Sequence, residues 1–322
     1  MGATTTDPII DVHCHCTLQR FQKAVLTDGV DWHGMTTADG ELDNVKNRWE
    51  VPKRLETMDE LRIDVQLVSP TDVFYQYHQR PEVTEVIAKE ANEEIAGMVQ
   101  DHPDRFMGLG TLPMQDPARA VTEMTRGIKE LGLTGFMIDD HVNGLTYDHD
   151  LFEPVWEAAQ DLGVFLLIHQ FQHTTVTYRT RRYFLLNSIG NLVDRTITFA
   201  AFIYGGVLDR HPNLTICLCH GGGYVPYALD RLDKGWDVRS VKETAVDAGI
   251  RGVKLGLPKV NIGLLPGADR AAVSARCPRP PCLEAVGRRL APSLIRGQIA
   301  QARAAASMLQ TEMSIDAQSL RT

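Results

Sequence analysis

The sequence contains no long hydrophobic run and no strongly basic segment. Its longest nearly uncharged apolar stretch, residues 198–208, is far shorter than the roughly 18 to 20 residues that a membrane-spanning helix requires. The N-terminus lacks the basic region and the apolar run of a secretory signal. The net charge is -8, and Arg179–Arg182 is the most prominent basic cluster, which argues against nucleic acid as the main partner. We therefore expect a soluble protein that acts on a small molecule.

The six cysteines do not form the pattern of a disulfide framework. Two pairs, Cys14/Cys16 and Cys217/Cys219, lie at the alternating spacing of strands beside histidines rather than in loops. This setting is typical of a reduced, cytoplasmic protein. Alternation directs the four thiols towards a helical layer, so we interpret them as small core residues rather than as metal ligands.

The chain has 322 residues, 43% of them hydrophobic, so it can bury a large core as one large domain or two medium ones. Short apolar runs rich in β-branched residues predict six buried strands: 9–16, 65–70, 106–112, 135–140, 164–170 and 214–220. Apolar residues at helical spacing predict four helices between them: 81–100, 116–131, 150–162 and 192–210.

This repeated alternation of strand and helix indicates a parallel sheet, which is either open and doubly wound or closed as a barrel. The length favours the α/β class with a (β/α)8 TIM barrel. Residues 17–47 interrupt the rhythm and show no clear period, so we expect a long loop after the first strand. Loops in this position build active sites in barrel folds.

Histidines end three of the predicted strands. In the motif Asp11-Val-His-Cys-His, alternation places His13 and His15 on one face, where two imidazoles can bind one metal ion. His169 and His220 each end a further apolar strand. A single such histidine is readily explained as a hydrogen-bonded core residue, but three strands that end in histidine at one edge of a sheet favour metal chemistry.

Two arginines are candidates for binding an anionic substrate. Arg54 lies at the start of the helix that leads into the second strand, and Arg231 lies in the segment after His220. An arginine near a catalytic cation suits a carboxylate substrate. The alternative is a surface ion pair with one of the neighbouring acidic residues, Glu50, Glu56, Asp230 or Asp233.

Further motifs accompany these residues: Arg48-Trp49 with Met58-Asp59, the run from Arg105 to Met114, His141-Val-Asn143, and His220-Gly-Gly-Gly-Tyr-Val-Pro-Tyr227. Together they resemble the amidohydrolase superfamily, and within it the 2-amino-3-carboxymuconate 6-semialdehyde decarboxylase-like branch. The resemblance extends from about residue 9 to residue 239.

The resemblance implies a (β/α)8 barrel with one zinc ion per chain, held by His13, His15 and His169, and no organic cofactor. In this family the residue that matches His220 lies beside the metal-bound water and acts in proton transfer. Arg54 resembles the arginine that binds the substrate carboxylate. Arg231 resembles one that reaches into the neighbouring subunit's site, which implies a homodimer.

Three functions follow as alternatives. The first is a zinc-dependent, non-oxidative decarboxylase of a small unsaturated or aromatic carboxylic acid. The second is a metal-dependent hydrolase that uses the same site. The third is an inactive, metal-binding relative. Release of CO2 without an added nucleophile would separate the first from the second, and turnover would separate both from the third.

The C-terminal part departs from the family. The family's last zinc ligand is an aspartate in a Gly-Ser/Thr-Asp-Tyr/Trp-Pro motif that this sequence does not contain, and no aromatic residue follows Trp236. We expect one barrel domain over residues 1–322, and we interpret residues from about 240 to 322 as an atypical part, either altered in sequence or disordered. The fourth metal ligand stays open.

Overall fold

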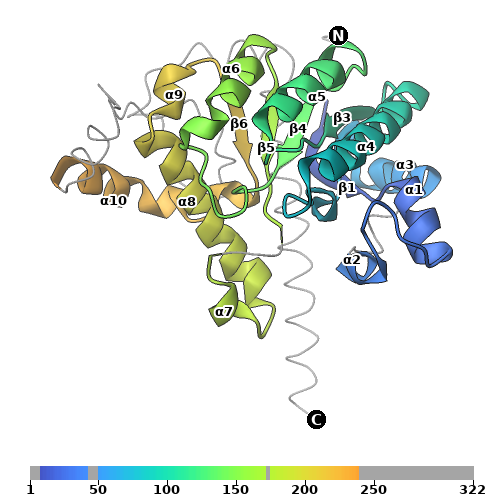
Figure 1. The fold of residues 1–322 in the computed structure, drawn as a ribbon, viewed down its shortest axis with the longest axis horizontal. Helices are drawn as coiled ribbons and strands as arrows, with labels where there is room; N and C mark the ends of the chain where they lie inside the picture. The colour runs from blue at the N-terminus through green and yellow to red at the C-terminus, as the bar shows by residue number, and fades with distance from the viewer. Residues whose placement is uncertain (1–7, 43–49, 172–174, 239–322) are drawn as a thin grey trace, which may run out of the picture.

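The computed structural model describes residues 8–42, 50–171 and 175–238. In this part of the chain, six parallel strands form one sheet in the order β1-β2-β3-β4-β5-β6, which is also their order in the sequence (Figure 1). The strands are β1 (Ile10–Cys16), β2 (Val65–Pro70), β3 (Phe106–Gly110), β4 (Gly135–Ile138), β5 (Phe165–Ile168) and β6 (Thr215–Leu218). The six strands predicted from apolar runs are therefore confirmed, with β3, β4, β5 and β6 shorter than expected.

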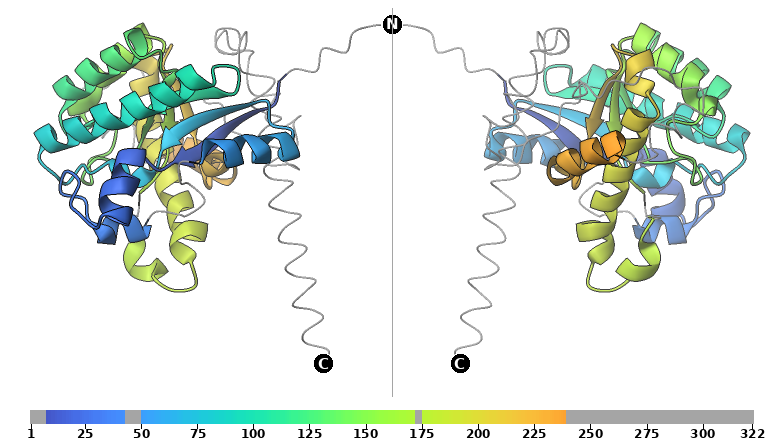
Figure 2. Two further views of the ribbon diagram at one scale, coloured as in Figure 1. Left: turned by 90° about the vertical axis from the view of Figure 1, so that its right-hand side faces the viewer. Right: turned by 90° about the vertical axis from the view of Figure 1, so that its left-hand side faces the viewer.

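Helices and helical turns connect consecutive strands, as β-α-β crossovers require, and the last two of them follow β6. They are α1 (Gln19–Phe21), the π-helical turn η1 (Gln22–Thr27), α2 (Thr37–Leu42), α3 (Val51–Leu61), η3 (Asp72–Phe74), α4 (Pro81–Asp101), α5 (Pro117–Lys129), η4 (Asp150–Phe152), α6 (Glu153–Asp161), α7 (Thr177–Thr180), η5 (Leu186–Gly190), α8 (Asn191–Tyr204), α9 (Val207–Arg210), η6 (His220–Gly222) and α10 (Val225–Val238). Figure 2 shows that α4 and α5 lie side by side over the sheet.

The four predicted helices are confirmed, with one correction. The segment 192–210 is not a single helix, because α8 ends at Tyr204 and α9 begins only at Val207. Gly206, between them, adopts a left-handed conformation with φ of 65°, which glycine accepts without steric cost and which interrupts a right-handed helix.

The segment predicted as a long loop, 17–47, is partly helical where the structure describes it, up to residue 42. Its apolar residues form a second hydrophobic cluster against the start of α4. This cluster was not predicted, because the segment shows no clear sequence period. The buried members are Leu18, Phe21, Val25, Trp32, Met35, Val73, Phe74, Ile87 and Ala91. Tertiary burial therefore orders a segment whose local sequence favours a loop.

The sheet is curled, and this curl positions the site. β1 and β6 are its two edge strands and are not paired with each other. Nevertheless, the ring centroids of His13 on β1 and His220 after β6 lie 5.1 Å apart. The six strands thus form an incomplete barrel, in agreement with the α/β barrel class. Residues 239–322, which include the part predicted to be atypical, lie outside the described residues, so closure of the barrel by eight strands stays a prediction.

Two further predictions are that the cysteines are core residues and that the chain has no membrane-spanning helix. No disulfide bond joins Cys14, Cys16, Cys217 and Cys219, and all but the half-buried Cys14 are fully buried in the core. Among the described residues, no helix combines the length and the apolar character that a membrane span requires.

Candidate metal centre

Strand β1 brings two histidines to the same face. His15 pairs in register with Ser69 on β2, and its Nδ1 lies 2.9 Å from the Ser69 hydroxyl. The Nε2 atoms of His13 and His15 are 3.2 Å apart. This contact confirms that alternation along the strand places both imidazoles on one face, and it leaves them close enough to bind one ion.

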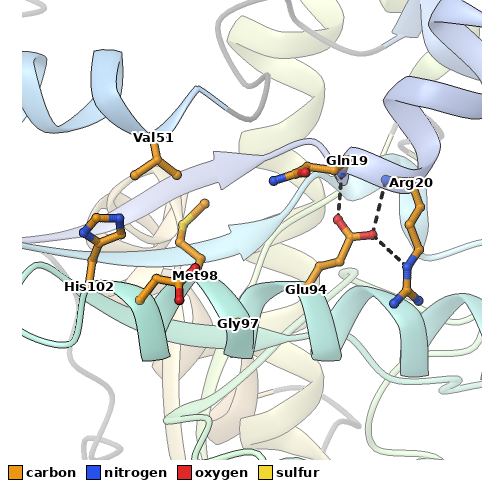
Figure 3. Close-up of a pocket in the computed structure, with 8 residues that line it drawn as sticks. Gln19, Arg20, Val51, Glu94, Gly97, Met98 and His102 are labelled. Atoms are coloured by element: carbon orange, nitrogen blue, oxygen red, sulfur yellow. Dashed lines mark hydrogen bonds and ion pairs between the residues drawn. The ribbon is translucent and has the colours of Figure 1, made fainter.

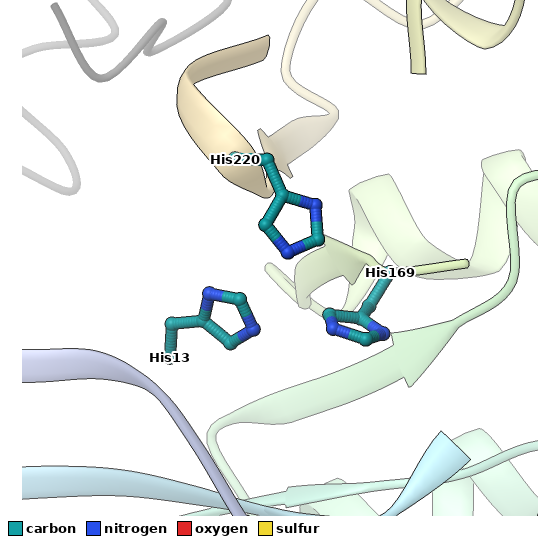
Figure 4. Close-up of side chains that lie close together, drawn as sticks. All are labelled: His13, His169 and His220. Carbon is teal, nitrogen blue, oxygen red and sulfur yellow. The ribbon is translucent and has the colours of Figure 1, made fainter. Parts of the chain in front are cut away.

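His169 and His220 complete a cluster of four imidazoles at the carboxyl ends of the strands. The ring centroid of His169 lies 4.6 Å from that of His15, 4.9 Å from that of His13 and 5.2 Å from that of His220. Figure 4 shows three of the rings, those of His13, His169 and His220, turned towards a common centre. Candidate ligand atoms of these three residues all lie within 4.8 Å of one another.

Backbone geometry at the strand ends holds His169 and His220 in place. The amide of His169 donates to the carbonyl of Ile138 on β4, which continues the ladder one residue beyond β5. His220 begins a turn in which it and the three following glycines all have positive φ. Glycines accept this conformation readily, so the chain reverses directly after His220 and leaves its side chain at the strand end.

Burial keeps the four imidazoles uncharged. Desolvation, followed by the charges of neighbouring groups, lowers the pKa of His13 to about 4, of His15 to about 3 and of His220 to about 2, and it lowers the pKa of His169 well below its usual range. Neutral imidazoles present lone pairs, which is the form that a metal ion binds.

The residues present fit a divalent metal ion. Nδ1 of His169 and Nδ1 of His220 are buried and have no hydrogen-bond partner among the described residues, which is costly unless another group binds the cluster. Imidazole clusters of this kind bind zinc and other first-row metals. Whether the ligands are the predicted His13, His15 and His169, or include His220, stays a prediction.

A direct consequence of the lowered pKa values is that the metal-free chain should lose stability in acid. An unfolded histidine protonates as the pH falls below 6.5, whereas the folded cluster resists protonation until about pH 4 or lower. At pH 5 each such histidine should lower the free energy of unfolding by about 2 kcal/mol relative to pH 7. Urea unfolding between pH 7 and 5 measures this loss. The variant H220N, with one fewer titrating ring, should show a smaller loss, and an equal loss in both chains would contradict the assignment.

The two predicted arginines occupy different environments. Arg54, on α3, donates from Nη2 to the carbonyl of His15 at 2.7 Å and from Nη1 to Oε1 of Gln66 at 3.2 Å. Its buried Nε has no hydrogen-bond partner among the described residues. Arg54 therefore lies directly behind the β1 histidines. It forms no ion pair within the described residues, so the alternative of a surface pair is not seen there.

Arg231 is not brought into the histidine cluster by any contact within the described residues. It lies on α10 and is exposed, and it forms no hydrogen bond or ion pair with another described residue. The structure therefore leaves its side chain available to solvent or to another molecule.

Several polar residues near the cluster were not predicted from the sequence. Arg195 on α8 is completely buried and pairs with Asp140 after β4. Tyr75 donates its hydroxyl to the carbonyl of His169 at 2.9 Å. Asp72 has Oδ2 at 3.9 Å from Nδ1 of His169. The one signal for Arg195 was its place beside Asp194 in a helical segment that is otherwise uncharged.

Asp139 is a further titratable group at the end of β4. Burial raises its pKa to about 7, against the opposing effect of His141. Its Oδ1 accepts hydrogen bonds from the amides of Asp140 and Phe171. Asp139 therefore links the end of β4 to Phe171, two residues after His169.

A separate surface cleft of about 330 Å³ lies between α1 and α4 and contains none of the cluster histidines (Figure 3). Glu94 in its wall accepts from the amides of Gln19 and Arg20, at 2.7 and 3.3 Å, and pairs with the Arg20 guanidinium. The carboxylate is thus engaged in capping α1, and the cleft offers no chemistry comparable to that of the cluster.

Comparison with known proteins agrees with this site. The chain is 31% identical over 230 residues to the 2-amino-3-carboxymuconate-6-semialdehyde decarboxylase of Dictyostelium discoideum, a match that covers 71% of this chain and 60% of that protein. It is also 31% identical over 192 residues to the gamma-resorcylate decarboxylase of Polaromonas sp., covering 56% of this chain and 58% of the relative. The matches thus span less than two thirds of the length of each of these two relatives.

Solved structures show the same fold. The 5-carboxyvanillate decarboxylase of Sphingomonas paucimobilis aligns with a TM-score of 0.63 at 27% identity, covering 80% of this chain and 76% of that one. A dihydroxybenzoic acid decarboxylase of Polaromonas sp., with bound manganese and the inhibitor 2-nitroresorcinol, aligns with a TM-score of 0.60 at 25% identity, covering 70% and 69%. The amidohydrolase family model matches residues 10–241, and on this evidence the chain belongs to the amidohydrolase family.

Proposed function

We propose that this protein is a zinc-dependent, non-oxidative decarboxylase of a small unsaturated or aromatic carboxylic acid. The observation that carries the proposal is the convergence of four neutral imidazoles at the carboxyl ends of parallel strands, where barrel enzymes bind their substrates. The names of the relatives support the reaction, since they are decarboxylases of aromatic or unsaturated acids.

In this proposal His13, His15 and His169 hold one zinc ion per chain. The ion would supply positive charge close to the substrate's oxygens. Arg54 lies behind the same histidines and would bind the carboxylate through its guanidinium. The buried strand ends would exclude water, which strengthens both interactions.

His220 is the residue that we assign to proton transfer. Loss of CO2 breaks the bond between the carboxyl carbon and the ring or chain carbon, and that carbon must receive a proton. The imidazole of His220 is uncharged at neutral pH, so it must first take up a proton from solvent water before it passes one to carbon. Its position at the open end of β6, 5.1 Å from the His13 ring, suits this role.

The substitution R54A should raise KM for a carboxylate substrate by about tenfold or more, with a smaller change in kcat, because a charge-assisted contact to the acid group is lost. Initial rates of CO2 release over a range of substrate concentrations measure the two constants. K53A, which removes an exposed charge from the preceding position of the same helix, serves as the control. An unchanged KM in R54A would remove Arg54 from the substrate site.

We also infer a homodimer in which Arg231 reaches the neighbouring chain's site, and a cytoplasmic location. The exposed side chain of Arg231 supports the first inference, and the absence of disulfide bonds among the four described cysteines supports the second. Molar mass in solution tests the homodimer.

The test of the proposed function is CO2 release by the full chain loaded with one equivalent of zinc. We expect release from a panel of hydroxybenzoic and aminomuconic acids without any added nucleophile. Hydrolysis of ester or amide substrates in the absence of CO2 release would instead support a hydrolase, and zinc binding without either reaction would support an inactive relative.

A further inference from the structure

Arg195 joins the ends of two strands directly behind the metal centre. Its side chain is completely buried, and its guanidinium donates from Nη1 to Oδ1 of Asp140 and from Nη2 to Oε1 of Gln170, both at 2.8 Å. Asp140 follows β4, and Gln170 is the residue after His169. One planar group therefore fixes the distance between the turn that carries His169 and the neighbouring strand end.

The same helix also holds the turn that carries His220. The hydroxyl of Thr196 on α8 accepts from the amide of Tyr224 at 2.9 Å. A Cβ atom on Gly223 would lie 2.4 Å from the carbonyl of Leu192 and 2.9 Å from Cβ of Arg195, so the glycine turn after His220 packs directly on α8. Helix α8 thus contacts the turns of both histidines.

Stability alone does not explain a buried pair of this kind. Transfer of two charges out of water costs several kcal/mol per ion, and well-packed apolar residues of similar volume are often as stable or more so. The pair is also incompletely satisfied, because Nε of Arg195 and Oδ2 of Asp140 are buried without hydrogen-bond partners among the described residues. The guanidinium fixes the orientation of its two acceptors, the side chains of Asp140 and Gln170. An apolar pair cannot do this.

Arg195 also does not serve to attract the metal ion. A guanidinium near the cluster repels a cation, and its charge contributes to the lowered pKa values of His13, His169 and His220. Pairing with Asp140 offsets this charge. The site therefore uses the planar geometry of the guanidinium rather than its positive charge.

We propose that Arg195 is a positioning residue of the metal centre, which holds His169 through Gln170 and Asp140 in the orientation that binds a divalent ion. This inference rests on the proposed function, because it requires that the cluster bind a metal. Loss of a group that orients a metal-binding histidine typically weakens metal affinity about 10- to 100-fold.

The experiment separates positioning from stability with the double variant R195M/D140L. The single variant R195M should be destabilised, because it leaves Asp140 buried without its partner. The double variant replaces the ion pair with an apolar pair and should recover stability in urea unfolding. If Arg195 positions His169, the zinc affinity of the double variant, measured by competition with a chelator, stays about 10- to 100-fold weaker than that of the unsubstituted chain.

Recovery of zinc affinity together with stability in the double variant would overturn the inference. Q170L provides a second measurement that keeps the Arg195–Asp140 pair, and it should also weaken zinc binding. E123Q is the matched control, because Glu123 is a buried carboxylate bonded to Asn92 and Arg126 on α4 and α5. We expect it to lower stability and leave zinc affinity unchanged. Failure of the unsubstituted chain to bind zinc would overturn the proposed function and this inference together, whereas equal binding by all variants would overturn this inference alone.

Discussion

Replacement of His220 by asparagine should reduce the rate of CO2 release by about 10²- to 10⁴-fold, because a positioned general acid–base group contributes a factor of this size. Asparagine preserves a polar side chain of similar reach but cannot take up and release a proton near neutral pH. The zinc content should remain close to one ion per chain. Initial rates under saturating substrate, together with elemental analysis of the same preparation, measure both quantities.

The two readouts of this experiment distinguish the possible roles of His220. His220 lies within the group whose candidate ligand atoms approach each other to within 4.8 Å, so its geometry also permits metal binding. Loss of zinc along with activity in H220N would move His220 into the ligand set. Full activity with zinc retained would exclude it from proton transfer. H78A replaces an exposed histidine outside the cluster and should leave the rate and the zinc content unchanged.

The second large effect concerns the metal itself. The substitution H169A should lower the zinc content from about one ion per chain to near zero, because the ring of His169 approaches those of His13, His15 and His220. With the ion absent, CO2 release should fall to the uncatalysed rate. Elemental analysis after dialysis against dilute zinc measures the stoichiometry.

Protein folding must be assessed in the same preparation. Thermal unfolding of the metal-free H169A variant should begin at a temperature close to that of the metal-free unsubstituted chain, since Nδ1 of this uncharged imidazole accepts or donates no hydrogen bond among the described residues. Unsubstituted chain with zinc should unfold at a higher temperature, as expected for a ligand that binds only the folded state. A zinc content in H169A equal to that of the unsubstituted chain would show that His169 is not a ligand.

Much of the site could be predicted because its residues carry strong local signals. His13 and His15 alternate on one strand, and His169 and His220 each end an apolar run, so the parallel order of the strands brings all four to one edge of the sheet. The second hydrophobic cluster could not be predicted in this way. Its residues, such as Phe21 and Trp32, are irregularly spaced, and they come together by packing on Phe74.

The sequence by itself determined the order of strands and helices, the family and the kinds of side chain at the strand ends, because these follow from local periodicity and motifs. Only the tertiary structure decided which groups surround the histidines. Arg195 forms hydrogen bonds with Asp140, 55 positions away in the sequence, and with Gln170, 25 positions away. The rings of His13 and His220 are in contact although their strands are not paired. Contacts of this kind depend on the curl of the sheet and on the docking of α8, and no local pattern encodes either.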